Sequence, residues 1–355
     1  MAATATALSA GKPMLAAGDY KMAVIGLVHS HVWGHLGTML KGEYAKLVGI
    51  AETVPELVEA AKKRGASNVP FFDDYRKMLE ETKPDLVWAF VENNRHQEIV
   101  QACAPKKIHV MFEKPLAATY AQAVSVRRLA REHGIQVMTN YQMAWWPANY
   151  SAKAAADSGA LGQVWRLRGI VGHGGPGTSE GLNKYFFDWL TDPVKNGAGA
   201  LMDFGCYNAL WSLWYLGRPA KVFAQVNHLR PQLFPKVEDN ADLTLSYKHG
   251  VGIFEASWDL PRGYQDLEVF GNKGSVYMKN GSVELRTSEK PEPVELHPLP
   301  EDRSEPLAFM VSSLKSGKPL DGLTALDINV EVVEIIEAAK MSVRTGRAIP
   351  LPSTS

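Results

Sequence analysis

The stretch Val110-Met111-Phe112-Glu113-Lys114-Pro115 decides the fold of this 355-residue sequence. Residues 108–112 are mostly apolar and show no polar alternation, which is typical of a parallel strand covered on both faces. Ligands of open α/β sheets bind just beyond the carboxyl ends of such strands. Lys114 stands at that end, with Pro115 restricting the backbone behind it. We expect Lys114 to face a ligand; the alternative is a surface lysine in the loop after a core strand.

Apolar segments alternate with helical patterns on both sides of this stretch. Alternation of this kind predicts an α/β fold with a doubly wound parallel sheet. The predicted strands are 21–26, 46–51, 71–72, 85–90, 108–112 and 136–139, and the predicted helices start near residue 33, cover 55–64, follow Asp73-Asp74 and cover 118–133.

The pattern changes after Pro147. From residue 220 to 285 the chain reads as successive strands separated by short turns such as Gly271-Asn272-Lys273-Gly274. We expect a second α/β domain with a large, mainly antiparallel sheet that is open on one face. Its other predicted elements are helices over 147–156, 200–216 and 325–344 and a strand over 162–172.

The composition excludes several classes of protein. Hydrophobic residues make up 46% and charged residues 21% of the chain, which is typical of a globular protein. Lys+Arg and Asp+Glu both number 38, so the chain has no bulk charge with which to bind nucleic acid. No apolar run approaches the roughly 18 residues of a membrane helix. The two cysteines, Cys103 and Cys206, argue against a disulfide framework and a cysteine zinc site.

The turn after the first predicted strand, Gly26-Leu27-Val28-His29-Ser30-His31, has the position of a dinucleotide-binding turn. Such turns usually read G-x-G-x-x-G, and here Val28 and His31 replace the second and third glycines. Glu52 ends the second predicted strand, where a carboxylate accepts the ribose hydroxyls and repels a 2′-phosphate. We therefore expect NAD rather than NADP, bound by Gly26, Val28, His29, Ser30, His31 and Glu52.

The histidines of this turn raise the possibility of a metal site. His29, His31 and His35 have the spacing HxH-x3-H. No acidic or further histidine cluster with ligand spacing supports a metal ion, and histidines in a phosphate-binding turn can act as hydrogen-bond donors. We expect no metal.

A second group of residues lies in the segment 197–207, GAGALMDFGCY. Asp203 and Tyr207 are four residues apart, which places them on one face of the predicted helix. Residues 209–216 are apolar nearly all round, so this helix is buried and its polar groups need partners. One interpretation is a packing network. The other is a proton relay aimed at the cleft, which requires Lys114 to approach this face.

Aromatic residues and a histidine are the candidates for the substrate pocket. Trp145 and Trp146 lie at the crossover between the domains and can stack on a sugar or pack at the junction; we favour packing. Trp146, His173 in its glycine-rich loop and Trp189 are the expected substrate contacts.

These motifs together resemble the oxidoreductase family grouped as Gfo/Idh/MocA, over about residues 21–352. Glu113-Lys114-Pro115 matches the EKP motif of that family, residues 197–207 match its GGGxLxDxGxH/Y block, and His96 matches a histidine often found after the fourth strand. The resemblance implies a Rossmann domain over 21–146, and over 147–355 a substrate domain whose open sheet forms the oligomer interface. Residues 1–20 would be a flexible start or the remnant of an export signal.

The resemblance also implies roles for individual residues. Lys114, Asp203 and Tyr207 would be catalytic, with Tyr207 in the place where relatives such as glucose–fructose oxidoreductase use tyrosine as acid/base. Asn93, His96, Glu113 and Lys114 would contact the cofactor. A nearby Lys114 ammonium would lower the pKa of the Tyr207 phenol by favouring the phenolate.

The expected function is NAD(P)-dependent hydride transfer to or from a sugar, polyol or sugar derivative. The alternative is an NAD-dependent glycoside hydrolase or keto-sugar lyase with tightly bound NAD, and a third reading is a non-enzymatic binding protein. We expect a carbohydrate substrate, a homodimer or homotetramer, no nucleic acid and no membrane. The cytoplasm is the expected compartment, with export as the alternative.

Overall fold

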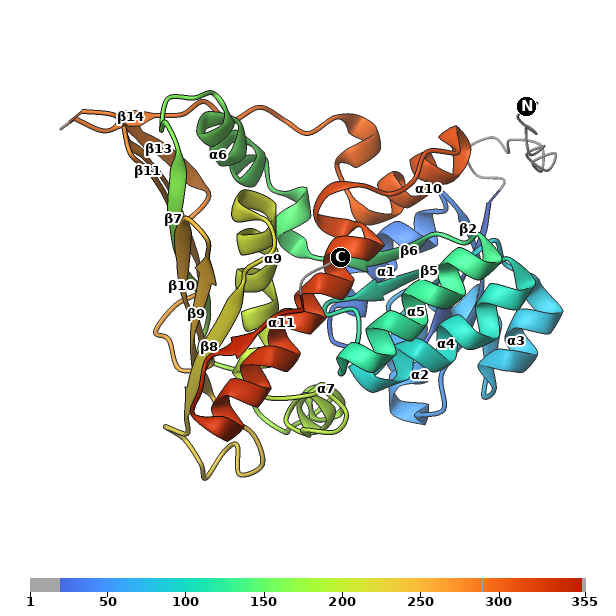
Figure 1. The fold of residues 1–355 in the computed structure, drawn as a ribbon. Coiled ribbons are helices and arrows are strands. Elements are labelled where there is room, and N and C mark those ends of the chain that lie inside the picture. The colour runs from blue at the N-terminus through green and yellow to red at the C-terminus, as the bar shows by residue number, and fades with distance from the viewer. Residues whose placement is uncertain (1–19, 289, 353–355) are drawn as a thin grey trace, which may run out of the picture.

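The structure is a computed structural model that describes residues 20–288 and 290–352, and the expectation for residues 1–19 lies outside them. Its first sheet is parallel, with the strand order β3-β2-β1-β4-β5-β6 (Figure 1). The strands are β1 Lys21–Ile25, β2 Lys46–Ala51, β3 Phe71–Phe72, β4 Leu86–Ala89, β5 His109–Glu113 and β6 Val137–Asn140. This arrangement confirms the predicted doubly wound sheet.

Both faces of this sheet are buried, which explains the absence of polar alternation. Ala23 and Ile25 of β1 lie in one core, and Met22 and Val24 lie in the other. The helices that contribute to these two cores include α1 Val32–Lys41, α2 Pro55–Lys63, α3 Tyr75–Thr82, α4 His96–Cys103 and α5 Tyr120–His133. Asp74 caps α3 by accepting from the Arg76 N–H, as the pair Asp73-Asp74 predicted.

The second sheet has nine strands in the order β14-β13-β12-β11-β7-β10-β9-β8-β15. Its neighbouring strands are antiparallel except β7 and β10, which pair in parallel. The strands are β7 Val164–Gly172, β8 Lys221–Asn227, β9 Asn240–Tyr247, β10 Gly250–Ser257, β11 Tyr264–Gly271, β12 Ser275–Lys279, β13 Ser282–Arg286, β14 Glu292–Pro293 and β15 Ile349–Pro350.

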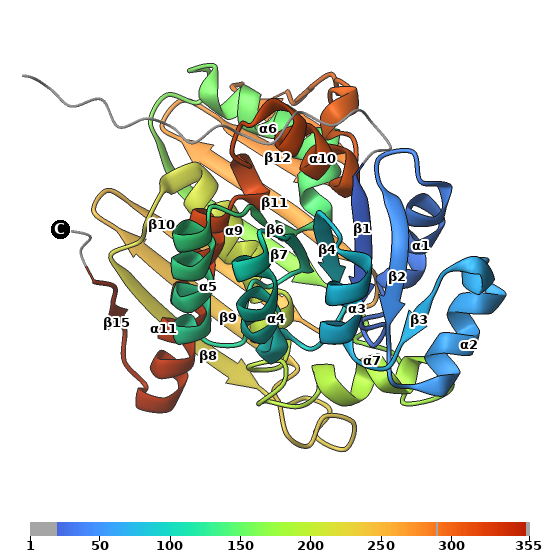
Figure 2. The same ribbon diagram turned by 90° about the vertical axis from the view of Figure 1, so that its right-hand side faces the viewer.

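Helices cover one face of this sheet and leave the other bare (Figures 1 and 2). The covering helices are α6 Pro147–Asp157, α9 Gly205–Leu216 and α11 Leu326–Thr345. On the bare face, Phe223 and Ile253 are 39% and 36% exposed. The sheet is therefore open on one face, as expected.

Two helices in the second half of the chain were not predicted, α7 Asn183–Leu190 and α10 Pro306–Ser316. Leu307 and Met310 of α10 pack into a core of the first sheet, so the chain returns to the N-terminal domain. Helix α11 joins both domains, because Val333 lies in a core of the first sheet and Ile336 in the core of the second. No helix among the described residues is long and apolar enough to cross a bilayer.

The single helix predicted over 200–216 is wrong. The chain forms α8 Ala200–Asp203, a break at Phe204, and then α9. In a continuous helix the Asp203 carbonyl would accept from the Tyr207 N–H. Here the Tyr207 N–H donates to the Phe204 carbonyl, and the Asp203 carbonyl accepts from Lys114 Nζ at 2.9 Å instead. Asp203 and Tyr207 thus lie on two successive helices, not on one helical face.

Candidate active site

Lys114 lies at the carboxyl end of β5 and reaches across the domain junction to Asp203. Its Nζ forms an ion pair with Asp203 Oδ1 and donates to the Asp203 carbonyl at 2.9 Å. Both residues are only 6% exposed. The surface-loop interpretation of Lys114 is therefore wrong, and the contact that a proton relay requires is present.

The charges of this pair hold each other in place. Burial favours the neutral lysine, but the Asp203 carboxylate, together with smaller contributions from Tyr207 and Cys206, more than offsets this and raises the pKa of Lys114. Burial likewise favours neutral Asp203, while the charge and hydrogen bond of Lys114 hold the pKa of Asp203 below its ordinary value. The second carboxylate oxygen accepts from Trp258 Nε1 at 2.8 Å, so Asp203 is anchored on both oxygens.

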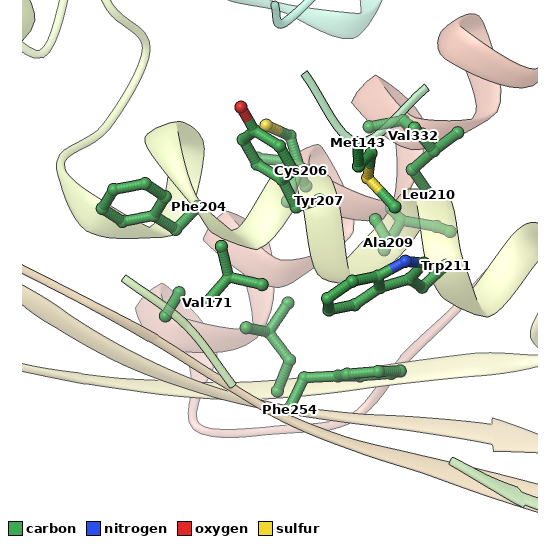
Figure 3. Packing of buried hydrophobic residues seen from close by; sticks show 14 of the residues in the cluster. Met143, Val171, Phe204, Cys206, Tyr207, Ala209, Leu210, Trp211, Phe254 and Val332 are labelled. Carbon is green, nitrogen blue, oxygen red and sulfur yellow. The ribbon is translucent and has the colours of Figure 1, made fainter. Parts of the chain in front are cut away.

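Tyr207 lies beside this pair, in the first turn of α9. Lys114 Nζ is 5.2 Å from the centre of the Tyr207 ring. Figure 3 shows the Tyr207 hydroxyl pointing away from the buried Trp211 and Phe254. This hydroxyl forms no hydrogen bond within residues 20–288 and 290–352, and it is not among their fully buried polar atoms without a partner. It is therefore available to a ligand.

The pKa of Tyr207 is raised, contrary to the expectation of a lowered value. Burial raises it, and the Lys114 charge lowers it by less than burial raises it. The expected direction of the lysine effect was right, but the sequence did not show how deeply the phenol is enclosed.

Glu113, next to Lys114 in the sequence, points back into the first domain. It is 1% exposed, and its two oxygens lie 2.8 Å from His31 Nδ1 and 2.8 Å from Asn140 Nδ2. Burial favours neutral Glu113, and the bond from His31 holds the pKa of Glu113 below its ordinary value. Trp145 Nε1 donates to Asn140 Oδ1 at 2.8 Å, so Trp145 serves this network at the junction.

Sequence reasoning missed Asn140 and Trp258. Asn140 is the last residue of β6, so the rule that selected Lys114 at the end of β5 could have selected it too. Trp258 follows β10, and nothing in its sequence neighbourhood indicates that its ring nitrogen meets Asp203.

The three turn histidines meet an acid that the sequence does not place near them. His29, His31 and Glu113 offer ligand atoms that all lie within 4.8 Å of one another. Hydrogen bonds account for this geometry: the His31 N–H donates to His29 Nδ1 at 3.3 Å, and His31 Nδ1 bonds Glu113. The Lys114 charge also disfavours a cation at His29, whose pKa is held well below its ordinary value mainly by burial. The expectation of no metal stays a prediction.

The turn after β1 has the donors that a dinucleotide pyrophosphate requires. Among the described residues, the N–H groups of Val28 and Ser30 have no acceptor, and they precede the N-terminus of α1. Gly26 has φ +77°, and a Cβ there would lie 2.4 Å from Val91 Cγ1, so glycine is required at this position. Val28 and His31 in place of glycines do not prevent the turn from forming.

Glu52 lies at the side of this turn, held by backbone N–H groups. It accepts from Leu27 at 2.6 Å, Thr53 at 2.7 Å and Val54 at 2.9 Å. A carboxylate has about four lone-pair sites, so one remains for a ribose hydroxyl.

His96 and Asn93 fit a polar ligand at the same end of the sheet. His96 Nδ1 bonds the Leu116 carbonyl at 3.0 Å, and burial lowers its pKa to about 4. Its other nitrogen is buried without a partner in the described chain, as is Asn93 Oδ1. The Asn93 amide group donates to Asn196 Oδ1 at 2.8 Å across the domain junction. The neutral His96 Nε2 is an acceptor that suits a cofactor hydroxyl, so the residues present fit NAD.

A pocket of about 720 Å³ opens beside Asp203. Trp146, His173 and Phe204 line it, and the His173 ring contacts Phe204 edge-on at 4.9 Å. Trp189, the third expected substrate contact, lies elsewhere. It is 2% exposed, and its ring nitrogen donates to the Val28 carbonyl at 3.3 Å, so it covers the dinucleotide turn.

Both halves of the chain match models of known protein families. Residues 20–141 match the model described as "Oxidoreductase family, NAD-binding Rossmann fold", and residues 150–277 match "GFO/IDH/MocA C-terminal domain". Together these matches cover most of the described residues: the first contains the parallel sheet, and the second contains the strands from β7 to β11 of the other sheet.

Among individual proteins, the chain is 27% identical to levoglucosan dehydrogenase of Pseudarthrobacter phenanthrenivorans, over 64% of this chain and 63% of that protein. It is 25% identical to myo-inositol 2-dehydrogenase of Thermotoga maritima, over 73% of this chain and 75% of that protein. The match therefore spans less than two thirds of the first of these relatives. Neither name describes a glycoside hydrolase or lyase.

The fold agrees with a solved structure entitled "Levoglucosan dehydrogenase, complex with NADH and levoglucosan". The TM-score is 0.78 at 20% identity, covering 94% of this chain and all of the other. The matches to both family models, the NAD-compatible turn and the Lys114–Asp203–Tyr207 group lead to one conclusion: the chain belongs to the GFO/IDH/MocA family of NAD-binding oxidoreductases.

Proposed function

We propose that this protein transfers hydride between NAD and a hydroxyl-bearing carbon of a sugar, polyol or sugar derivative. The observation that carries the proposal is the buried Lys114–Asp203 ion pair, which lies beside the Tyr207 ring at the carboxyl end of the parallel sheet. The relatives named as sugar and inositol dehydrogenases support this substrate class.

In this proposal the protein handles the proton of the reaction. Oxidation of an alcohol removes a proton from oxygen while a hydride leaves carbon, and bound NAD⁺ supplies the acceptor for that hydride. Tyr207 takes the proton from the substrate hydroxyl, or returns it in the reverse direction. Lys114 favours the phenolate by its charge and donates to the substrate oxygen. Asp203, anchored by Trp258, positions the Lys114 ammonium.

The residues proposed to hold NAD are those of the turn and the ends of β2, β4 and β5. The free N–H groups of Val28 and Ser30 would bind the pyrophosphate. Glu52 would accept a ribose hydroxyl and repel the 2′-phosphate of NADP, and His96 would accept a further hydroxyl.

We also propose that the bare sheet face forms the interface of a homodimer or homotetramer. Phe223 and Ile253 expose apolar surface in the middle of this face. Light scattering should give a mass above that of one chain, and Ile253→Asp should lower it; a monomeric wild-type protein would contradict the proposal. The cytoplasmic location stays a prediction.

The experiment that tests the function starts from the purified protein with nothing added. Denaturation followed by mass analysis identifies any bound nucleotide, and turnover is then measured with NAD or NADP against a panel of sugars, glycosides and inositols. Turnover that depends on added NAD supports the proposal. Stoichiometric bound NAD with no net reduction would point to internal redox cycling. A protein that binds neither nucleotide and oxidises nothing overturns the proposal.

A further inference from the structure

The 720 Å³ pocket beside the catalytic group is too large for a single sugar ring. Its volume lies in the range of about 300–1,000 Å³ that holds drug-sized ligands. The end of the pocket at His173 and Phe204 adjoins Asp203 and Lys114, and we call it the inner end. From there the lining continues to Tyr264, Met278 and Leu296. If a sugar occupies the inner end, most of the outer pocket stays free for another part of the substrate.

The lining of this pocket is uncharged. None of its described residues is Lys, Arg, Asp or Glu, and the pKa of His173 is lowered, mainly by burial, which favours the neutral imidazole. A phosphate or carboxylate placed here would lose its hydration without meeting a cation in the wall, which is costly. The substrate that this pocket fits is therefore neutral, which argues against a sugar nucleotide, a sugar phosphate or a uronic acid.

The outer wall is apolar and aromatic, and its tyrosine is held in place. Tyr264 lines the pocket, while Arg262 does not line it and lies with its guanidinium 3.5 Å from the centre of the Tyr264 ring. Arg262 in turn donates to Asn280 Oδ1 at 2.9 Å and to Asp266 Oδ2 at 3.2 Å. A ring fixed in this way offers a preorganised surface to a flat partner.

Two further residues complete the outer part. Leu296 lines the pocket with 39% of its surface exposed, so its side chain is accessible to a ligand there. Gln265 Oε1 is buried without a partner among the described residues and can accept a hydrogen bond from a ligand hydroxyl.

We infer that the substrate is a neutral glycoside and that the outer pocket binds its aglycone, a flat apolar group such as an aryl ring. The sugar occupies the inner end at His173 and Phe204. The aglycone packs against Tyr264, Met278 and Leu296. This inference rests on the proposed function and names its substrate class.

The test compares phenyl and methyl β-glycosides of the same sugar, in the glucose, galactose, mannose and xylose series, with NAD present. For the sugar that is turned over, kcat/KM for the phenyl glycoside should exceed that for the methyl glycoside by about tenfold or more, because the phenyl group leaves water. Calorimetric titration of both glycosides gives the same ratio of dissociation constants and does not require turnover.

Variants locate the effect. Leu296→Ser and Tyr264→Ala should each reduce the phenyl-to-methyl ratio at least about threefold, because each removes apolar contact with the aglycone. Leu233→Ser is the matched control, since Leu233 is 49% exposed but does not line the pocket. It should leave the ratio unchanged.

Failure of the inference and failure of the proposed function look different. Equal kcat/KM and equal dissociation constants for phenyl and methyl glycosides overturn the inference while leaving an active dehydrogenase. A protein that binds phenyl glycosides about tenfold more tightly but oxidises none of them keeps the aglycone pocket and overturns the proposed function.

Discussion

Glu113 and Lys114 are neighbours in the chain, yet their side chains serve different domains. Glu113 turns back into the parallel-sheet domain, where it bonds His31 and Asn140. Lys114 reaches forward to Asp203 of the second domain. Both residues are buried and both are ionised next to an opposite or polar partner.

The difference lies in what else surrounds the two charges. The Glu113 network is bounded by groups of the first domain and a junction tryptophan, so it stabilises the end of the sheet. The Lys114–Asp203 pair lies beside Tyr207, whose hydroxyl has no partner within residues 20–288 and 290–352, and next to Phe204, which lines the pocket. We therefore propose different roles for these two adjacent charges: Glu113 supports the scaffold and Lys114 meets the substrate.

Substitution of Lys114 should have the largest effect on activity. In Lys114→Met, turnover with NAD should fall by about three orders of magnitude or more, because a preorganised charge at the reacting oxygen is removed. Stability should also fall, by about 3–5 kcal/mol, because Asp203 stays buried without its cation. Steady-state kinetics and urea unfolding measure the two effects.

The double variant Lys114→Met/Asp203→Asn separates these effects. It should regain much of the unfolding free energy, since no uncompensated charge remains, but none of the activity. Lys153→Met, which removes a lysine from a surface pair with Asp157, is the control for loss of a lysine charge. Activity close to that of the wild type in Lys114→Met would remove Lys114 from the reaction.

Tyr207→Phe should have the second largest effect. We expect kcat to fall by about two orders of magnitude, as is typical when a general acid/base is removed. The unfolding free energy should change little, because the hydroxyl bonds no residue in the described chain. The control is Tyr215→Phe, which removes a buried hydroxyl from a tyrosine that has no proposed part in the reaction. An unchanged kcat in Tyr207→Phe would assign the proton transfer to another group.

Glu52→Gln should change cofactor preference rather than turnover with the preferred cofactor. Removal of the carboxylate charge should raise the ratio of kcat/KM for NADP to that for NAD by about tenfold, because the repulsion of the 2′-phosphate is lost. Glu59→Gln on the surface of α2 controls for the change in net charge. A constant ratio would mean that Glu52 only holds the turn.

Glu113→Gln should have the smallest effect on turnover and a clear effect on stability. The amide has one acceptor oxygen and cannot replace both carboxylate bonds, to His31 and to Asn140, so the unfolding free energy at pH 7 should fall by about 1–3 kcal/mol. Because folding lowers the pKa of Glu113 from its ordinary value of 4.5, its contribution is present above that pH and is lost as the pH falls below it. The stability difference between wild type and variant should therefore shrink in acid. A loss of turnover as large as that of Lys114→Met would end the division of roles between the two neighbours.

Several elements could be predicted because their causes are local. The apolar runs at 46–51 and 71–72 match β2 and β3 residue for residue, because a short apolar run bounded by turn and helix signals marks a strand from local sequence alone. Helix α10 was missed. Seven of the eight residues from Pro306 to Ser313 are buried, so this part of the helix lacks the polar face that marks a surface helix.

The candidate site could be predicted only in part, because its contacts join residues that are far apart in the chain. The sequence indicated correctly that three side chains come together, those of Lys114, Asp203 and Tyr207. It did not predict the break in the helix at Phe204. At this break the Asp203 carbonyl accepts from Lys114, 89 residues away, and from Cys206 Sγ at 3.3 Å. Trp189 was expected to contact the substrate, and that expectation stays a prediction; the structure adds a bond that the sequence could not show, from its ring nitrogen to the Val28 carbonyl, 161 residues away in the chain.

The sequence by itself determined the alternation of strands and helices, the turn that follows β1 and the acid that ends β2, since these follow from periodicity and position along the chain. Only the tertiary structure decided which side chain meets which: Glu113 with the histidines, Trp258 with Asp203, and an uncharged pocket with the Lys114–Asp203 pair. The physical reason is that burial and pairing depend on groups brought together from distant segments. Those same two factors set the ionisation of Lys114, Asp203 and Tyr207.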